Sequence, residues 1–388
     1  MLEIAIIGGG LCGLALANSL KAQGLSFALF EARDRLGGRI HTVPARNNGL
    51  PLDLGAAWFW PQTQPRITRL LNDLGLASFP QHGTGTLLSL NDPDAKPVPL
   101  ELEDLHSGAH RIEGGSAALI RVLAGRLPAE TLHLEHQLTR IVSRGAHVEL
   151  RFRRGQDTLV VQARQVVLAL PPRLAEERLE FDPPLNGQLR ETLRETPTWM
   201  AGNAKVLASY GGADGMDAGG IDRAAFWRDD GLSGNAVAGH PRAVLGEVHD
   251  ACDALGARAA LSGFFALPAS VRAAFRLGLP LLVRSQLAQF FGARAQEAEI
   301  RIQDWADEPF TCAKLDQTPS EEHPDYANRL LQTPVWDGLL HFGGSETAAY
   351  GGGYMEGALE AAGRLRREIM TTRAWRGNAE KETTTCAS

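Results

Sequence analysis

The chain has 388 residues, of which 44% are hydrophobic, and its 39 Lys and Arg against 45 Asp and Glu give a formal net charge of −6 at pH 7. A chain of this length and composition can bury a large core and should form two domains. The lack of a basic cluster argues against a nucleic-acid partner, and no apolar stretch approaches the roughly 20 residues that a membrane span requires.

The N-terminal residues form a nucleotide-binding pattern. Ile4–Ile7 predicts a short buried strand, and Leu14–Gln23 predicts a helix with apolar periodicity. Between them lies a G-x-G-x-x-G motif. The order of strand, motif and helix is the context in which this motif indicates nucleotide binding. Gly8 makes the tight turn, Gly10 lets the backbone approach a pyrophosphate, and Gly13 lets helix and strand pack closely. The pyrophosphate would then meet unpaired N–H groups at the positive end of the helix dipole.

An acidic residue follows at the expected place. The next predicted strand, Phe27–Phe30, ends at Glu31, whose carboxylate would accept hydrogen bonds from ribose hydroxyls and repel a 2′-phosphate. Gly37 and Gly38 then allow the chain to lie against a flat or charged ligand. Guanidinium groups suit pyrophosphate oxygens, and three lie in this stretch: Arg33, Arg35 and Arg39. An enzyme that binds a nicotinamide dinucleotide needs no second turn of glycines and arginines. The stretch from Arg33 to Arg39 therefore favours a flavin dinucleotide.

The middle of the chain alternates between helical and strand patterns. Residues 77–110 are rich in Gly, Pro, Asp and Asn and have little periodicity. The other predicted elements are a helix over Pro65–Leu74, a helix that opens after Arg111–Ser116 and runs to Leu127, and strands at Val148–Phe152, Leu159–Val161 and Val166–Leu170. No second G-x-G-x-x-G motif precedes an acid, which argues against a separate NAD(P) domain.

Cysteines and histidines give no clear metal signal. The cysteines form no C-x-x-C pair, which suggests reduced thiols and a cytoplasmic protein: Cys12, Cys252, Cys312 and Cys386. Two histidine pairs have usable spacing, but neither has further ligands nearby: His133 with His136, and His106 with His110. We therefore expect surface or core histidines and no metal. The N-terminus enters its first strand at once, without a targeting signal.

A lysine stands in the predicted strand that begins at Asn203. Lys205 has apolar neighbours on both sides. The pattern leaves two options: the side chain is exposed on one strand face, or it points inward, where burial would lower its pKa.

The last third carries another glycine-rich block, Gly343–Ala358, which leads into a predicted helix over Met355–Ile369. Glycines bring backbone onto a ligand. The first-turn N–H groups of the helix can meet the pyrimidine edge of a flavin, which gains negative charge on reduction. The polar segment Thr371–Ser388 is expected to be a flexible tail.

Together, several segments resemble the flavin-containing amine oxidase family, which includes monoamine and polyamine oxidases. They are Glu31–Arg39, Asp53–Trp58, Val166–Pro172, Phe226–Gly234, Asp304–Phe310 and Gly343–Ala358. The resemblance implies an α/β fold of the GR2 type, with a Rossmann-like FAD-binding domain and a discontinuous α+β substrate domain. The FAD-binding domain would comprise residues 1–76, 111–195 and 305–370, the substrate domain 77–110 and 196–304, and the tail 371–388.

The resemblance also implies residue roles. Lys205 would hydrogen-bond through a water to flavin N5, and Tyr354 would form one aromatic wall beside the substrate nitrogen. An aromatic face attracts an amine by about 0.5–2 kcal/mol. The residues expected to bind FAD are Gly8, Gly10, Leu11, Cys12, Gly13, Glu31, Ala32, Arg33, Gly38, Arg39, Gly55, Ala56, Ala57, Trp58, Leu138, Trp305, Glu346 and Met355.

The chain departs from the family pattern after Phe310. Without gaps, the flavin-linking cysteine of monoamine oxidases falls on Lys314 and the second aromatic wall on Leu315, whereas Cys312 is two residues short. We therefore expect non-covalent FAD and at most one standard wall.

These features predict an FAD-dependent oxidase that removes a hydride from the carbon next to an amine nitrogen. Its products would be an imine or aldehyde, ammonia and hydrogen peroxide, with dioxygen as the acceptor; the flavin carries the redox chemistry and the protein orients the amine. The alternative is an FAD-dependent desaturase or dehydrogenase that acts on a non-amine substrate or passes electrons to another acceptor.

Overall fold

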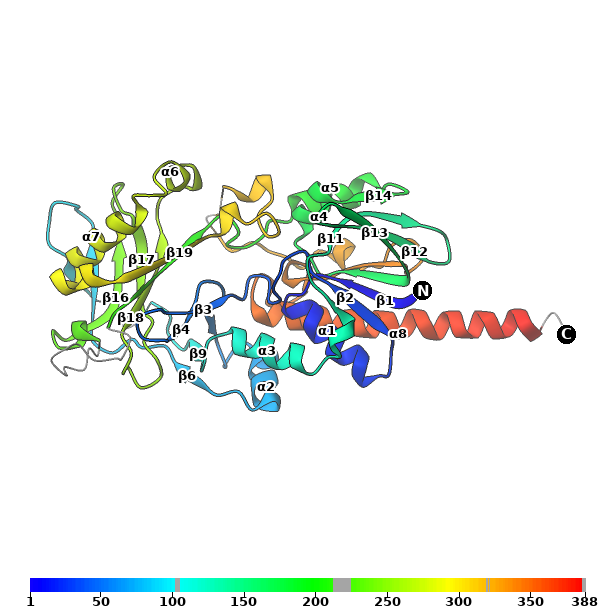
Figure 1. The fold of residues 1–388 in the computed structure, drawn as a ribbon, viewed down its shortest axis with the longest axis horizontal. Helices are drawn as coiled ribbons and strands as arrows, with labels where there is room; N and C mark the ends of the chain where they lie inside the picture. The colour runs from blue at the N-terminus through cyan, green and yellow to red at the C-terminus, as the bar shows by residue number, and fades with distance from the viewer. Residues whose placement is uncertain (102–104, 212–224, 319, 321, 386–388) are drawn as a thin grey trace. The chain divides into compact units, whose positions relative to one another are not determined.

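The computed structural model describes residues 1–101, 105–211, 225–318, 320 and 322–385. The chain forms two compact units, each assembled from separate stretches of sequence (Figure 1). Unit 1 consists of Met1–Gly38, Ile120–Trp199 and Ser320–Ser388, and unit 2 consists of Arg39–Leu119 and Met200–Pro319. These bounds differ from the predicted domain bounds, which refer to the binding of FAD and substrate rather than to compactness.

An eight-stranded mixed sheet forms the centre of unit 1. In spatial order its strands are β10 Leu132–His133, β2 Phe27–Phe30, β1 Leu2–Ile7, β13 Asp157–Leu168, β12 Val148–Arg154, β11 Gln137–Ser143 and β14 Glu180–Asp182, with β20 Leu340–Phe342 paired to β13. The strands from β10 to β13 and β20 are parallel, whereas β13, β12 and β11 form an antiparallel meander. The unit is therefore an α/β fold with the predicted Rossmann-like beginning.

Helix α1 (Leu11–Ala22) follows β1 directly and packs beside α8 (Met355–Thr385), as Figure 1 shows in blue and orange to red. The apolar face of α1 is buried, as expected for a helix that packs against its neighbours. Two further helices of this unit are α4 Pro172–Arg178 and α5 Gly187–Glu195. The predicted strand, turn, helix and strand at the N-terminus are thus confirmed.

Two sequence-based boundaries in unit 1 were wrong. The strands predicted at Leu159–Val161 and Val166–Leu170 belong to the single strand β13, because polar residues between them stay in the ladder with β12 and β1. Helix α8 continues to Thr385, through much of the segment predicted as a flexible tail. No proline interrupts residues 371–385, and seven of these fifteen residues are Ala, Glu, Lys or Arg, which favour a helix.

Unit 2 is built on a seven-stranded sheet. In spatial order its strands are β19 Glu299–Asp304, β15 Ala204–Ser209, β18 Ala260–Phe265, β17 Leu245–Asp250, β16 Leu232–Ala238, β7 Thr86–Leu90 and β8 Val98–Leu100. Smaller ladders join β3 Thr42–Pro44 with β4 Pro51–Asp53, and β5 Trp58–Phe59 with β9 His110–Ile112 and β6 Ser78–Pro80. The helices are α2 Pro65–Leu74, α6 Ala269–Ala274 and α7 Leu279–Phe291, while α3 Ala117–Gly125 includes residues of both units.

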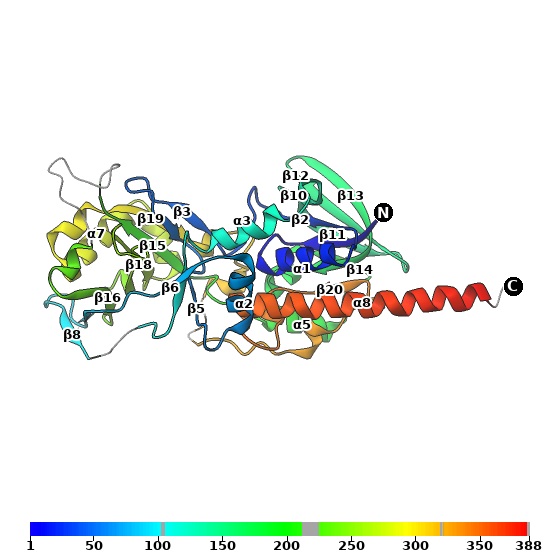
Figure 2. The same cartoon turned by 90° about the horizontal axis from the view of Figure 1, so that it is seen from below.

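Helix α7 packs its buried side chains into the core of this sheet, beside which it lies in Figure 2. Phe226 and Trp227 lie in the same core. Residues 77–110, in which little regular structure was predicted, contribute β7 and β8 to the sheet, and most side chains of β7 are buried. Among the described residues, no helix combines the length and hydropathy of a membrane span.

Candidate active site

The glycines of the N-terminal turn in unit 1 have distinct geometries. Gly8 has a φ of 110°, and a Cβ placed there would overlap a backbone carbonyl oxygen. A Cβ on Gly13 would overlap the carbonyl oxygen of Gly8, so helix and strand can approach only because Gly13 has no side chain. A Cβ on Gly10 would meet nothing nearer than the Gly37 oxygen at 4.0 Å, and no side chain caps the helix that begins after it. The open space at this helix N-terminus fits a pyrophosphate.

Glu31 is buried and held in one orientation. The Gly9 N–H donates to its Oε2 at 2.8 Å, while the Arg33 N–H and Nη1 donate to its Oε1 at 3.0 and 3.2 Å. Oε1 thus accepts two hydrogen bonds, whereas Oε2 keeps a further lone pair for a ribose hydroxyl. Arg33 thus orients Glu31, and Arg35 Nη1 donates to the carbonyl of Gly38 at 3.1 Å.

Residues from the two ends of the chain meet within unit 1. The Gly344 N–H donates to the Sγ of Cys12 at 3.3 Å, and burial raises the pKa of this thiol to about 11. Cys12 is therefore a protonated packing residue. Glu346 lies in the short helix η7 (Ser345–Thr347), where its side chain is buried and its Oε2 accepts from the Ser345 hydroxyl at 3.0 Å.

Tyr354 belongs to an aromatic group. Its ring stacks on His323, with centroids 4.9 Å apart and planes at 7°. Trp199 meets His323 edge-on at 4.9 Å, and the Nε2 of His323 lies 3.0 Å from the carbonyl oxygen of Gly352. Burial raises the pKa of Tyr354, which keeps its hydroxyl neutral. No local sequence pattern pointed to His323 or Trp199, because both are distant in the chain from the glycine-rich block.

The remaining predicted residues of unit 1 differ in what they offer. Met355 is buried and starts α8, and Gly38 has a φ of 57° with its α-carbon facing the Gly10 backbone. Leu138 lies on β11 inside the hydrophobic core, so its side chain serves packing. The histidines His133 and His136 cluster around Phe30 rather than around an ion site.

Lys205 is the most unusual group of unit 2. Its side chain is 3% exposed, and Nζ donates to the carbonyl of Gly55 at 3.1 Å. Burial lowers the pKa of Lys205 to about 8; Asp53 opposes this effect and Arg111 adds to it. The structure thereby settles the choice left open by the sequence, because the lysine points inward.

Aromatic rings surround the Lys205 ammonium. Nζ lies 4.9 Å from the Trp58 ring centroid and 5.6 Å from that of Phe264, distances at which cation–π attraction operates. Lys205 and Phe264 are directly opposite each other in the ladder of β15 and β18. The Trp58 Nε1 donates to Gln81 at 2.8 Å, which fixes the indole.

The segment 55–58, whose residues are expected to bind FAD, lies beside two other predicted residues. The Ala56 N–H donates to the Arg39 carbonyl at 3.2 Å, and a Cβ on Gly55 would overlap that same oxygen. The Trp305 Nε1 donates to the Leu54 carbonyl at 3.0 Å. Arg39, Gly55, Ala56 and Trp305 are thus neighbours in unit 2, as a shared ligand requires.

The segment after Phe310 agrees with the predicted departure from the family pattern. Cys312 is buried, whereas Lys314 and Leu315 are exposed. Leu315 offers no aromatic wall.

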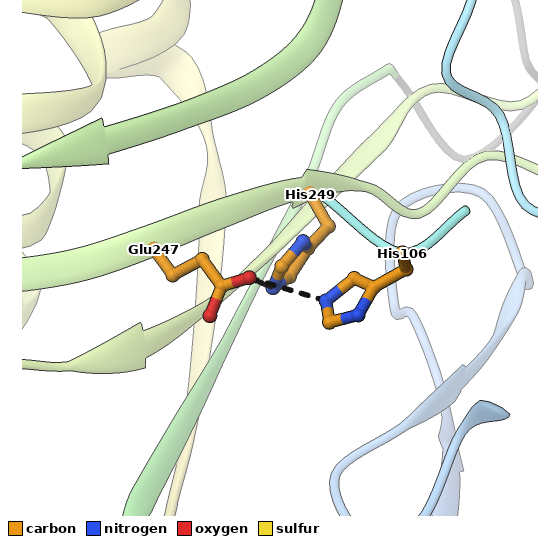
Figure 3. A group of neighbouring side chains, drawn as sticks. All are labelled: His106, Glu247 and His249. Carbon is orange, nitrogen blue, oxygen red and sulfur yellow. Dashed lines mark ion pairs between the residues drawn. The ribbon is translucent and has the colours of Figure 1, made fainter. Parts of the chain in front are cut away.

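A polar group that the sequence did not predict lies beside Trp58. His106 stacks on the indole at 4.4 Å, and His249 meets it edge-on at 4.9 Å. Both imidazoles lie near the carboxylate of Glu247 (Figure 3). Burial lowers the pKa of His249 well below its usual value, with further contributions from His106 and Lys205. The E-x-H spacing on a strand was the signal available, but His106 is remote in sequence.

Comparisons with known proteins agree with this arrangement. The family model described as flavin containing amine oxidoreductase matches residues 11–107, 98–255 and 278–369. Flavin-containing amine oxidase B of Sus scrofa is 24% identical over 95% of this chain and 86% of its own length. A putative flavin-containing monoamine oxidase of Mycobacterium tuberculosis is also 24% identical, over 95% and 96%.

Solved structures share the fold. Putrescine oxidase bound to putrescine superimposes with a TM-score of 0.76 at 21% identity, covering 95% of this chain and 99% of its own. Cyclohexylamine oxidase from Brevibacterium oxydans gives a TM-score of 0.76 at 20% identity, over 97% and 99%.

Proposed function

The chain belongs to the flavin-containing amine oxidoreductase family, as an FAD-dependent enzyme acting on amines, and from this premise we propose that it is an oxidase with dioxygen as acceptor. The amine loses a hydrogen with two electrons from its α-carbon and a proton from nitrogen, which gives an imine. Water hydrolyses the imine to an aldehyde and ammonia. When bound, FAD accepts the two electrons and passes them to dioxygen, which gains two protons and leaves as hydrogen peroxide.

We assign the binding of FAD to the residues predicted from the sequence. The open turn at Gly10 receives the pyrophosphate, and Glu31 receives ribose hydroxyls. The segment 55–58, with Trp305 beside it, lines the flavin ring. We further propose that the cofactor is held without a covalent bond, because no cysteine stands at the linking position.

The buried Lys205 ammonium is the observation that carries the assignment as an oxidase. A cation in a water-poor aromatic setting stabilises the negative charge that develops as dioxygen accepts electrons. With a pKa of about 8, Lys205 remains largely charged at neutral pH despite its burial. Burying a charge costs free energy, and a hydrophobic side chain would pack this position better. The charge is therefore best explained by a function.

Tyr354 is proposed to orient the amine. Its ring is held by the stacked His323, so it can present a fixed aromatic surface to an amine nitrogen. The relatives named above act on monoamines, putrescine and cyclohexylamine according to their names. We propose an amine with a hydrogen on its α-carbon as the substrate of this chain. The buried, reduced thiols of Cys12, Cys252 and Cys312 support a cytoplasmic location.

Anaerobic flavin reduction tests the amine assignment. The holoprotein would be mixed with primary, secondary and cyclic amines and with putrescine, and loss of the yellow absorbance followed. At least one class should bleach the flavin; no bleaching by any class would refute amine oxidation. Peroxide formed per amine consumed should approach one. A low peroxide yield with rapid turnover by an artificial acceptor would instead identify a dehydrogenase.

A further inference from the structure

Three potential metal ligands converge in unit 2, outside the residues assigned above to FAD and amine. Figure 3 shows the side chains of His106, Glu247 and His249 pointing toward one another. The Oε1 of Glu247 lies 3.2 Å from the Nε2 of His106 and 3.5 Å from the Nε2 of His249. One ligand atom from each residue falls within 4.8 Å of the other two.

The sheet explains why these groups meet. Glu247 and His249 are two residues apart on β17, so their side chains share one face. Glu247 and Lys205 both stand opposite Phe264, on the two strands that flank β18. His106 approaches from the segment before β9 and is fixed by its stacking on Trp58. The three ligands are therefore held by a rigid sheet and a packed indole, as a metal site requires.

His249 is the residue that ordinary packing does not explain. Its side chain is 1% exposed, and neither ring nitrogen makes a hydrogen bond within the described residues. A buried polar group without a partner costs about 1–3 kcal/mol. A simple ion pair with Glu247 would need a charged imidazolium, which such burial disfavours. A neutral imidazole instead keeps a lone pair that an ion can use.

The two donor distances to Glu247 fit a small divalent ion. Zn²⁺ binds imidazole nitrogen and carboxylate oxygen at about 2.0–2.2 Å, so two ligands at tetrahedral angles stand about 3.3–3.5 Å apart. The two distances to the Glu247 oxygen, 3.2 and 3.5 Å, agree with this spacing. The Glu247 side chain is 33% exposed, which leaves access from solvent.

We propose that His106, Glu247 and His249 form a binding site for a divalent transition metal, with Zn²⁺ the ion that it favours. Two imidazoles and one carboxylate are a known zinc ligand set that leaves a fourth position for water or a polar ligand. This site is additional to the proposed amine oxidation, in which the flavin carries the electrons and no metal is needed. It also reverses the sequence-based expectation of no metal, since His106 binds with partners remote in sequence rather than with His110.

Metal binding by the FAD-loaded protein tests the proposal directly. After dialysis against a chelator, calorimetric titration with Zn²⁺ should give one ion per chain at micromolar concentration. Co²⁺ should give visible absorption bands typical of four- or five-coordinate geometry. Failure of the wild-type protein to bind either ion would overturn the proposal, and would leave amine oxidation untouched if amines still bleach the flavin.

Variants locate the ion. H249A, H106A and the nearly isosteric E247Q should each weaken Zn²⁺ binding by at least about 100-fold, beyond the 10- to 100-fold typical of losing an outer-shell partner. H110A is the matched control, because His110 packs beside Phe59 and is not part of the group. Flavin content and melting temperature establish that E247Q is folded. Unchanged Zn²⁺ affinity in folded E247Q, or equal loss in H110A, would refute this ligand set.

Discussion

At the scale of single residues, Lys205 offers the sharpest test. Replacing it with Met keeps most of the volume but removes the ammonium that donates to Gly55. We expect K205M to slow flavin reoxidation by dioxygen roughly 100-fold, the usual effect of losing a group that stabilises developing charge. Anaerobic reduction by amine should change much less. Stopped-flow measurement of the two half-reactions separates these effects, with K96M, at an exposed lysine, as control.

The same residue predicts a pH dependence. Burial lowers the pKa of Lys205 to about 8, so its ammonium is charged below that pH and neutral above it. If charge assists dioxygen, the reoxidation rate constant should fall as the pH rises through about 8. Chemical or photochemical reduction before mixing removes the titration of the amine substrate from the measurement. A profile of the same shape in K205M would assign the titration to another group.

Tyr354 tests amine binding separately from oxygen chemistry. Y354A should raise the amine dissociation constant by about 2- to 30-fold, the equivalent of 0.5–2 kcal/mol of aromatic attraction. Y354F keeps the ring stacked on His323 and should stay close to wild type. Tyr350, an exposed tyrosine in the same glycine-rich block, supplies the control Y350A. Equal effects of Y354A and Y350A would remove Tyr354 from the site.

At the scale of elements, the turn from β1 to α1 allows two opposed glycine substitutions. G13A places a methyl group on the Gly8 carbonyl oxygen and should destabilise the fold by about 1–3 kcal/mol. G10A meets nothing nearer than 4.0 Å and has an extended backbone that alanine accepts. Its methyl group would instead fill the space assigned to the pyrophosphate.

We therefore expect G10A to weaken FAD binding by at least about tenfold, or 1.4 kcal/mol, while the melting temperature of the apoprotein hardly changes. Fluorescence titration with FAD and calorimetry of the apoprotein measure the two quantities. If G10A lowers the stability of the apoprotein as much as G13A does, Gly10 is needed for tight packing, and its assignment to the pyrophosphate would lose its support.

The elements that the sequence predicted well are those with local signals. The strand at Ile4–Ile7, the glycine turn and the acid at Glu31 follow from residues close together in the chain, and the structure contains each of them. The strand β13 was divided because Gln162, Arg164 and Gln165 interrupt its apolar pattern. Burial of β7 depends on its pairing with the remote strand β16, which a local pattern cannot report.

The candidate site was less accessible to prediction for the same reason. The inward direction of Lys205 depends on three strands coming into register, and only the family resemblance suggested its role. His323 beside Tyr354, and His249 beside Trp58, are brought in by folding over long sequence separations. No rule of sequence spacing connects the members of these pairs, so their proximity can be seen only in the folded structure.

At the scale of the whole molecule, FAD should protect segments that are distant in sequence. The residues assigned to the cofactor come from stretches far apart in the chain, among them 8–13 and 55–58. A ligand that binds only the folded protein stabilises it by about 2.7 kcal/mol at 100 times its dissociation constant, so the melting temperature should rise with FAD concentration. Hydrogen exchange of the apoprotein with and without FAD should then slow in both segments.

Helix α7 is the internal reference, because it packs within the core of unit 2 and contains no assigned cofactor residue. Its exchange should slow less than that of residues 55–58. Protection confined to residues 8–13 would mean that only the nucleotide half of FAD binds at its assigned residues. The assignment of the flavin ring to Gly55, Ala56, Ala57 and Trp58 would then be wrong. Release of the yellow colour into the filtrate on denaturation, in the same samples, checks that the cofactor is held without a covalent bond.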